Sequence, residues 1–220
     1  MTIETATEIY TEVNSKVVDS SFDVDDTISF INKGIKEIAG AVLLPKLLET
    51  DTTIISVVDK AYASLPSNFM KHLHFCYSDT NYRKIKIYDS LELLYADFGK
   101  LDVGGNVVGV TRRGDRLYYQ RIPAAAETLR IHYYKYPTEL TIGTSKPDCL
   151  PEFLVRPLLV NYVLKEEYAV TEQGFEGRKI DTEHYEGKYL TAFADLVAYI
   201  GPEDRVPQMV NDTLNLEMYL

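Results

Sequence analysis

Several features that mark common protein classes are missing from this 220-residue sequence. It has no tryptophan and only two cysteines, Cys76 and Cys149, which are too few for a disulfide framework and are expected to be reduced thiols. The first residues, MTIETATEIYTEV, have neither a basic start nor an apolar core, so we expect no signal peptide. No apolar run reaches the length of a membrane span, so no membrane contact is expected.

Positive charge is also scarce, because 23 Lys and Arg stand against 33 Asp and Glu, giving a formal net charge of −10. Nonspecific binding to duplex DNA by charge is therefore disfavoured. An acidic surface can still be useful beside DNA, since it repels the backbone and lets the duplex slide past. Apolar residues make up 45% of the chain, which is enough for the core of one domain. The 17 tyrosines favour strands and protein interfaces.

Two amphipathic helices are predicted before residue 50. The first covers about residues 4–18 and repeats apolar residues every four positions. The second has Asp25 and Asp26 in its first turn and ends at about Leu44, because Pro45 follows. Its apolar face consists of Ile28, Ile31, Ile35, Ile38 and Val42.

Two further helices are predicted after residue 143. One runs to about Thr171; its first turn lies at Pro157, or it starts at Pro151 and is kinked at Pro157. The other covers about residues 181–200 and stops at Gly201. Its apolar face consists of Tyr185, Tyr189, Phe193, Leu196 and Ile200.

Between the helical pairs the pattern changes to a period of two, which is typical of strands. Strands are predicted at residues 54–61, 69–77 and 84–88, and Asp89-Ser90 precedes a short helix at 91–98. Residues 106–140 are predicted to form three strands in a row, joined by tight turns at Gly114-Asp115 and at residues 123–127. In the middle strand, Leu117, Tyr119 and Arg121 are predicted to lie on one side. In the last strand, Leu129, Ile131 and Tyr133 are predicted to share one side.

These patterns predict an α+β fold: a four-helix bundle-like body with an inserted antiparallel β domain and an extended C-terminal arm. The expected divisions are a helical pair at 1–50, the β domain at 51–142, a second helical pair at 143–201 that packs with the first, and the arm at 202–220. The arm has little periodicity and is expected to become ordered only against a partner.

Three residue patterns resemble known sites, and for each we favour a structural interpretation. His72, His74 and Cys76 alternate on one strand, but no fourth metal ligand is visible, so we expect polar residues facing outward. Arg113-Gly114-Asp115 resembles an integrin-binding tripeptide, but a hairpin turn requires the same Gly-Asp pair.

The third pattern is a group of acidic residues and a histidine that resembles part of a di-iron site. Such a site needs two Glu-x-x-His motifs, and only one approximate copy is present, so a solvated helix face is favoured. The residues are Glu166, Glu167, Glu172, Asp181 and His184. Nucleophile elbows, phosphate loops and dinucleotide glycines are absent from the sequence. We therefore expect no catalytic residue, no cofactor and no metal, and hence a protein that is not an enzyme.

Three segments, in this order, resemble the tailed-bacteriophage head-tail connector (adaptor) protein family. The first is INKGI at 31–35 followed by LLPKL at 43–47, and the second is ASLPSNF at 63–69. The third is LRIHYYKYPTEL at 129–140, followed by Leu150-Pro151 and a helix through Tyr168. In that family a strand ending in Tyr-x-x-Pro-x-x-Leu precedes a Leu-Pro helix in the same way.

The resemblance implies a non-enzymatic virion protein that forms a homo-oligomeric ring, dodecameric by analogy. Such adaptors are made in the host cytoplasm and sit in the neck, at the head-tail interface beneath the portal protein, where they join the capsid to tail or neck proteins and let DNA pass as cargo. Another tail or neck component, such as a tail terminator, is the main alternative. An enzyme or ligand-binding module with an unrecognised site is a weaker one.

The resemblance also implies that the arm docks on the portal or on neighbouring subunits. The candidate docking residues are the apolar side chains of the arm and one proline. They are Val206, Pro207, Met209, Val210, Leu214, Leu216, Met218, Tyr219 and Leu220.

Overall fold

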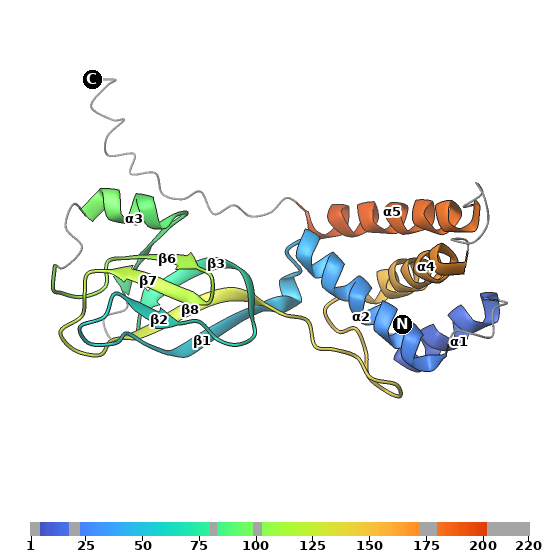
Figure 1. Cartoon of the computed structure of the whole chain (residues 1–220), viewed down its shortest axis with the longest axis horizontal. Coiled ribbons are helices and arrows are strands. Elements are labelled where there is room, and N and C mark those ends of the chain that lie inside the picture. Colours follow the sequence, from blue (N-terminus) through green and yellow to red (C-terminus); the bar gives the residue numbers. More distant parts are fainter. Residues whose placement is uncertain (1–4, 18–22, 80–82, 99–102, 172–179, 202–220) are drawn as a thin grey trace, which may run out of the picture.

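The computed structural model describes residues 5–17, 23–79, 83–98, 103–171 and 180–201. Within these ranges the chain forms five α-helices and two four-stranded sheets, which confirms the predicted α+β class. Four helices lie together at one end of the molecule, and the sheets with the short helix α3 lie at the other (Figure 1). The helices and strands follow the predicted order of helix, helix, strands, helix, helix.

Local capping residues fix the start of the first two helices. Helix α1 (Ala6–Lys16) begins at Thr5, whose Oγ1 accepts from Glu8 N at 3.3 Å while Glu8 Oε2 accepts from Thr5 N at 2.6 Å. Helix α2 (Val24–Ala41) begins at Asp23, whose Oδ1 accepts from the N–H groups of Asp25 and Asp26. α2 ends three residues before the predicted Leu44, and Pro45–Leu47 then form a single 3₁₀ turn, η1.

Helix α4 (Glu152–Thr171) is the centre of the helical part. It begins directly after Pro151, whose carbonyl accepts from Leu154 N and Val155 N, so Pro157 lies inside the helix. Of the two predicted starts, the one at Pro151 is therefore correct. Helix α5 (Ile180–Ile200) matches its prediction and ends at Gly201, whose φ of +79° suits glycine.

All four of these helices contribute to one apolar core. Helix α4 packs against α1, α2 and α5, and is buried nearly all round. The core includes Ile9 and Val13 of α1, Ile31, Ile35 and Ile38 of α2, Leu154, Val155, Leu158, Leu159, Val163 and Leu164 of α4, and Ala192 and Leu196 of α5. The two helical pairs were predicted to pack together, and a core shared by all four helices is consistent with that prediction. The bundle-like arrangement and the boundaries of the four divisions remain predictions.

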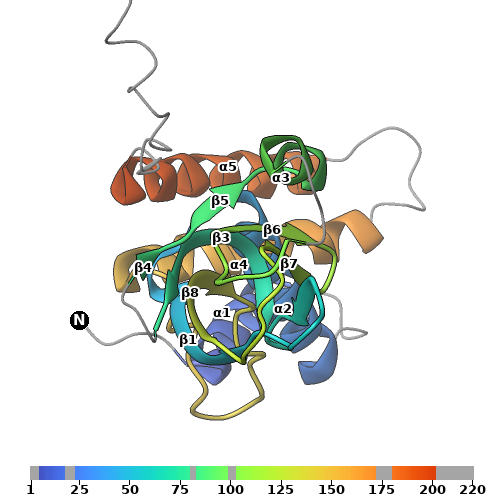
Figure 2. The ribbon, with the colours of Figure 1, turned by 90° about the vertical axis from the view of Figure 1, so that its left-hand side faces the viewer.

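The β part consists of two sheets that curl around a second core (Figure 2). One sheet has the order β1-β8-β3-β4 and is antiparallel, and the other has the order β2-β7-β6-β5, in which β5 and β6 are parallel. The strands are β1 (Leu48–Ile55), β2 (Tyr62–Ser64), β3 (Phe69–Ser78), β4 (Arg83–Lys84), β5 (Lys86–Tyr88), β6 (Gly109–Arg113), β7 (Arg116–Gln120) and β8 (Thr128–Lys135). Of the residues predicted to share one side of each strand, Leu117, Tyr119, Leu129, Ile131 and Tyr133 are buried. Arg121 is exposed, because β7 ends at Gln120 and does not include it.

The predicted three-stranded run at 106–140 is only half correct. β6 and β7 form the expected hairpin across Gly114-Asp115, with Gly114 at φ +63°. β8, however, pairs with β1 and β3 in the other sheet. The residues between β7 and β8 are not a tight turn, because Glu127 N donates to Ser56 Oγ and Glu127 O accepts from Ser56 N. These contacts carry the chain from one sheet to the other.

Two other strand predictions are also wrong in position. The strand predicted at 54–61 is instead β1 at Leu48–Ile55, followed by a connection to β2. β1 pairs with β8, so that Leu48 lies opposite Tyr134 and Asp51 lies opposite Ile131. This pairing outweighs the poor strand propensity of Glu49 and Asp51. Residues 84–88 are split, because β4 pairs with β3 whereas β5 pairs with β6.

Helix α3 (Leu91–Phe98) forms as predicted and is capped by Ser90, whose Oγ accepts from Leu93 N at 3.1 Å. It packs on β6 at Gly109, where an added Cβ would lie 2.7 Å from the Tyr88 ring and 3.0 Å from Leu94. A glycine is therefore required at this close approach.

Candidate functional site

The His72, His74 and Cys76 group does not share a face. Strand β3 shifts register three times between Phe69 and Phe75, and His72 has a φ of +48°. Cys76 is therefore fully buried in the β core, whereas His72 is exposed. The expectation that all three face outward is wrong for Cys76, because the bulges break the period of two. Among the described residues, no group of three His, Cys, Asp or Glu side chains could hold a metal ion.

The acidic group on α4 and α5 does not converge either. Glu166 is paired with Lys33 at 2.6 Å and with Lys165 at 3.0 Å. Glu167 is not on a solvated face as expected: it is 1% exposed and accepts from Thr27 Oγ1 at 3.1 Å. Burial raises the pKa of Glu167 to about 7. Asp181 and His184 are exposed on α5, and Glu172 lies outside the described residues.

Arg113-Gly114-Asp115 is the turn between β6 and β7, as the hairpin interpretation predicts. The Arg112 guanidinium beside it donates to Gly114 O at 3.1 Å.

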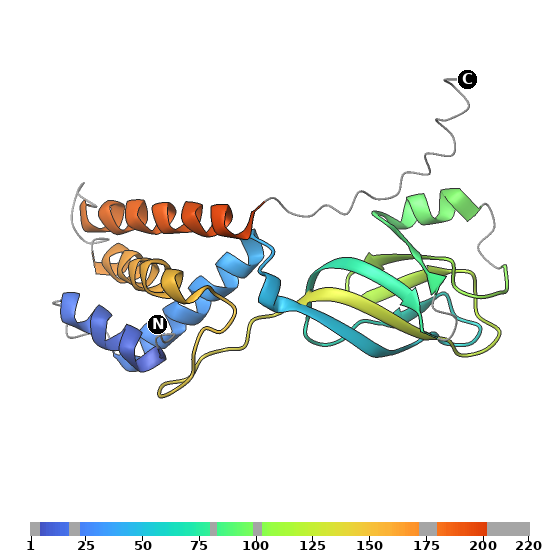
Figure 3. The same cartoon turned by 180° about the vertical axis from the view of Figure 1, so that it is seen from behind.

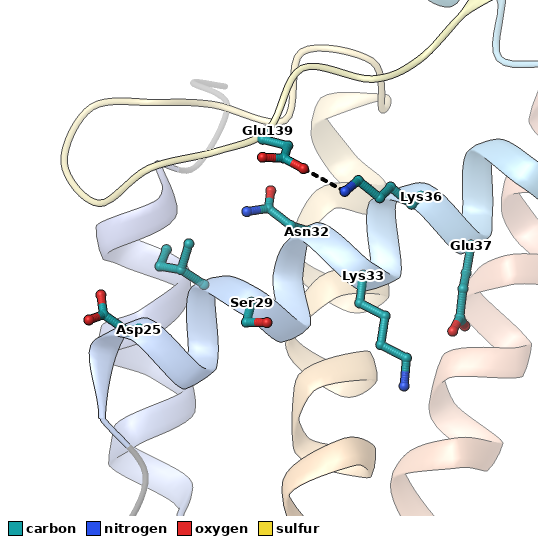
Figure 4. A pocket seen from close by; sticks show the side chains of 8 residues that line it. Asp25, Ser29, Asn32, Lys33, Lys36, Glu37 and Glu139 are labelled. Atoms are coloured by element: carbon teal, nitrogen blue, oxygen red, sulfur yellow. Dashed lines mark hydrogen bonds and ion pairs between the residues drawn. The ribbon is translucent and has the colours of Figure 1, made fainter. Parts of the chain in front are cut away.

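The hollow drawn in Figure 4 is a shallow polar groove of about 770 Å³ along α2. Its lysines are already engaged, because Lys36 Nζ lies 2.5 Å from Glu139 Oε1 and Lys33 Nζ lies 2.6 Å from Glu166 Oε2. Figure 4 shows Lys36 and Asn32 pointing to the segment that carries Glu139, and Lys33 pointing to the other side. The side chains that line the groove therefore mediate a contact between α2 and the connection that follows β8.

The residues of the INKGI segment of α2 contact three different parts of the molecule. Ile31 and Ile35 are buried in the helical core. Gly34 lies against Tyr162 of α4, where a Cβ would come within 2.7 Å of the ring. Asn32 Nδ2 donates to Leu140 O at 3.0 Å, and Leu140 N donates to Asn32 Oδ1 at 2.7 Å. This motif therefore joins α2 both to α4 and to the 136–151 connection between β8 and α4 (Figure 3).

The second and third motifs contact each other through Asn68. Its Oδ1 accepts from Tyr133 OH at 2.7 Å, and its carbonyl accepts from Tyr136 N at 2.9 Å. Glu49 joins them, because its Oε2 lies 2.9 Å from Lys135 Nζ and 3.3 Å from Asn68 Nδ2. The start of β3 and the end of β8 are thus held together where they approach the helices.

Lys71 of β3 closes the contact between the two parts. Its Nζ donates to Gly40 O at 3.0 Å and to Val42 O at 2.8 Å, which are carbonyls at the C-terminal end of α2. A cation at this end also suits the helix dipole. Met70 and Tyr134 pack against the helical core. We call the contacts of Asn32, Asn68, Lys71 and Leu140 the junction. Lys71 joins the β part directly to α2, the Asn32–Leu140 pair joins α2 to the connection that follows β8, and Asn68 holds the ends of β3 and β8 together beside these contacts.

Large apolar side chains are exposed on the outer side of α5 and at its end. Leu190 is 55% exposed, Tyr199 is 61% exposed, and the Tyr199 ring packs edge-on against Phe153, which is 53% exposed. These two rings border a pocket of about 370 Å³. Exposed apolar groups of this kind commonly mark protein interaction sites.

The junction joins two parts that both carry exposed apolar side chains, Leu190 and Tyr199 on the helical part and Ile55 and Leu93 on the β part. The SU10 adaptor protein family model matches residues 4–211. The chain belongs to this family. It is a family of phage head-tail adaptors, so the family resemblance carried by the three motifs is confirmed. A search of curated proteins finds no match to this chain.

As a member of the adaptor family, the protein is a phage structural component that interacts with other virion components. None of the described helices is both long and apolar enough to cross a membrane. The arm residues predicted to dock, from Val206 to Leu220, lie outside the described residues. The roles of Asn32, Asn68 and Lys71 were not predicted. The available signals were Asn32, a polar residue in the second predicted helix, and Asn68, an asparagine directly before a predicted strand.

Proposed function

We propose that this adaptor forms a ring beneath the portal, in the neck of the virion, and joins the capsid to the tail while DNA passes through. The match to an adaptor family over residues 4–211 carries the proposal. By family analogy the ring is dodecameric, and the role is structural and not catalytic.

The two-part shape supports a proposal in which each end of the molecule binds a different partner. The four helices and the arm at 202–220 dock on the portal or on neighbouring subunits, and the β part projects toward tail or neck proteins. The junction suits this role, because a bridge between two assemblies must keep its ends in one relative orientation. The net charge of −10 suits a channel wall that DNA passes without sticking.

The proposal is tested by mixing the purified full chain with the portal protein of the same phage and imaging the mixture by electron microscopy. We expect rings of this protein on one end of the portal. Rings that bind isolated tail tubes and not the portal would favour the alternative, a tail terminator, and would overturn the portal proposal.

The part played by the arm is tested in a portal pull-down. Deletion of residues 205–220 should weaken portal binding strongly, since these residues carry the candidate docking side chains. The exposed Leu93→Ala substitution on α3, in the β part, is the matched control and should leave binding unchanged. Unchanged binding by the deletion variant would show that the arm does not dock on the portal.

A further inference from the structure

The pocket bordered by Phe153 and Tyr199 lies where the helical part meets η1. It is lined by Leu44 and Pro45 at the start of η1, by Pro151 directly before α4, and by Ile200 at the end of α5, together with Cys149. Figure 1 shows the end of α5 beside the end of α2. The walls are mainly apolar, and two of the rings stand in solvent with more than half of their surface exposed.

The last described residues of the chain lie at this pocket. Ile200 is one of its walls, and Gly201, at φ +79°, is the last described residue before the arm. Val206 follows five residues later, so an extended chain reaches at most about 18 Å from Gly201 to Val206. A short tether of this kind gives an effective concentration in the millimolar range, far above that of a separate molecule at micromolar concentration.

The order of charges also fits. Lys46 and Glu152 both line the pocket, so its charges are of both signs. The arm begins with Pro202, Glu203, Asp204 and Arg205, and the apolar residues Val206, Met209 and Val210 follow. Residues of both charges beside Lys46 and Glu152, followed by apolar residues beside exposed aromatic rings, are complementary to this pocket.

We propose that the Phe153–Tyr199 pocket holds residues 203–210 of the same chain while the subunit is free, and releases them when the arm docks on the portal. The holding site is independent of the portal, whereas the release step rests on the function proposed above. In this arrangement the apolar part of the arm is covered before assembly, which limits premature contacts between free subunits.

The first test measures the rate at which Cys149 of the folded full chain, without portal, is alkylated by N-ethylmaleimide. The double variant Val206→Asp/Met209→Asp should raise this rate at least about threefold, because the tethered segment no longer covers the pocket. The matched control, Leu214→Asp/Leu216→Asp, should react like the natural chain. Cys76, fully buried in the β core, serves as an internal reference for intact folding. Equal Cys149 rates in all three proteins would overturn the proposal.

The second test distinguishes the occupants of the pocket. A Val206→Cys variant is treated with a short bis-maleimide, and the link to Cys149 is located by mass spectrometry. We expect a link within one chain, in a yield several-fold above that of a Thr213→Cys variant. A link between two chains, or no link above the control, would overturn the proposal. Neither test involves the portal, so failure here leaves the portal proposal standing, and failure of portal binding leaves this result standing.

Discussion

Asn32 holds both backbone groups of Leu140, although 108 positions separate them in the sequence. The carboxamide accepts from Leu140 N at 2.7 Å and donates to Leu140 O at 3.0 Å, as a paired strand residue would. This contact ties the connection after β8 to the middle of α2. Since Lys36 pairs with the adjacent Glu139, two successive residues of the connection are fixed on the same helix.

Asn32→Ala should lower the free energy of unfolding by about 1 to 3 kcal/mol, because it leaves two part-buried backbone groups without their partner. Urea denaturation followed by circular dichroism measures the change. Ser29→Ala, at an exposed position one turn earlier in α2, is the control and should change stability by less than about 0.5 kcal/mol. Equal stability of the two variants would mean that water replaces the asparagine at no cost.

Gly34 and Gly40 make a matched pair within α2. Gly34→Ala places a Cβ 2.7 Å from the Tyr162 ring, so α2 and α4 must move apart, and stability should fall by about 1 to 3 kcal/mol. Gly40→Ala meets nothing within 4 Å and should raise stability by about 0.5 to 1 kcal/mol, since alanine favours the helix. Thermal unfolding of both variants tests this, and a Gly34→Ala protein as stable as Gly40→Ala would contradict the close packing.

The helices could be predicted from the sequence because their signals are local. Ser90 before α3 and Gly201 after α5 act within one turn, and both helices lie where they were expected. The pairing of strands depends on residues far apart. β1 is rich in Glu, Asp and Thr and becomes a strand only because β8 lies beside it. No local pattern showed that β7 and β8 belong to different sheets.

The junction was missed for the same reason. The three motifs were recognised in order, yet Asn68 meets Tyr133 across 65 positions and Lys71 meets the end of α2 across about 30. Glu167 was expected on a solvated face, because the acidic group to which it belongs has only one approximate Glu-x-x-His motif. Its burial depends on how α4 packs against Thr27 of α2, which periodicity along α4 alone does not reveal.

Lys71→Met should loosen the connection between the two parts while leaving each core intact. The variant keeps the apolar stem of the side chain but leaves the carbonyls of Gly40 and Val42 without their donor, at a cost of about 1 to 2 kcal/mol. We expect a wider distribution of distances between spin labels placed on α5 and on α3. Lys60→Met, at an exposed position in the β1–β2 connection, is the control. An unchanged distribution would show that apolar packing alone fixes the orientation.

Glu167 should make stability fall as pH rises. Its pKa is about 7 in the folded protein, against 4.5 for an ordinary glutamate, so the folded state holds a proton that the unfolded state has released. The stabilisation is complete below pH 4.5 and is lost as pH rises through 7. Since one pKa unit corresponds to about 1.4 kcal/mol and the pKa rises from 4.5 to about 7, the loss is about 3 to 4 kcal/mol.

Glu167→Gln isolates this effect from the ion-paired carboxylates, such as Glu12 and Glu166, whose lowered pKa values act in the opposite direction. A neutral amide still accepts from Thr27, so the variant should gain stability relative to the natural chain between pH 4.5 and pH 7 and show little further gain above pH 8. Urea denaturation across this range measures the difference, and Glu183→Gln on the exposed side of α5 should show no such gain. A difference that stays flat with pH would mean that Glu167 is ionised in the folded protein and is stabilised there by its surroundings.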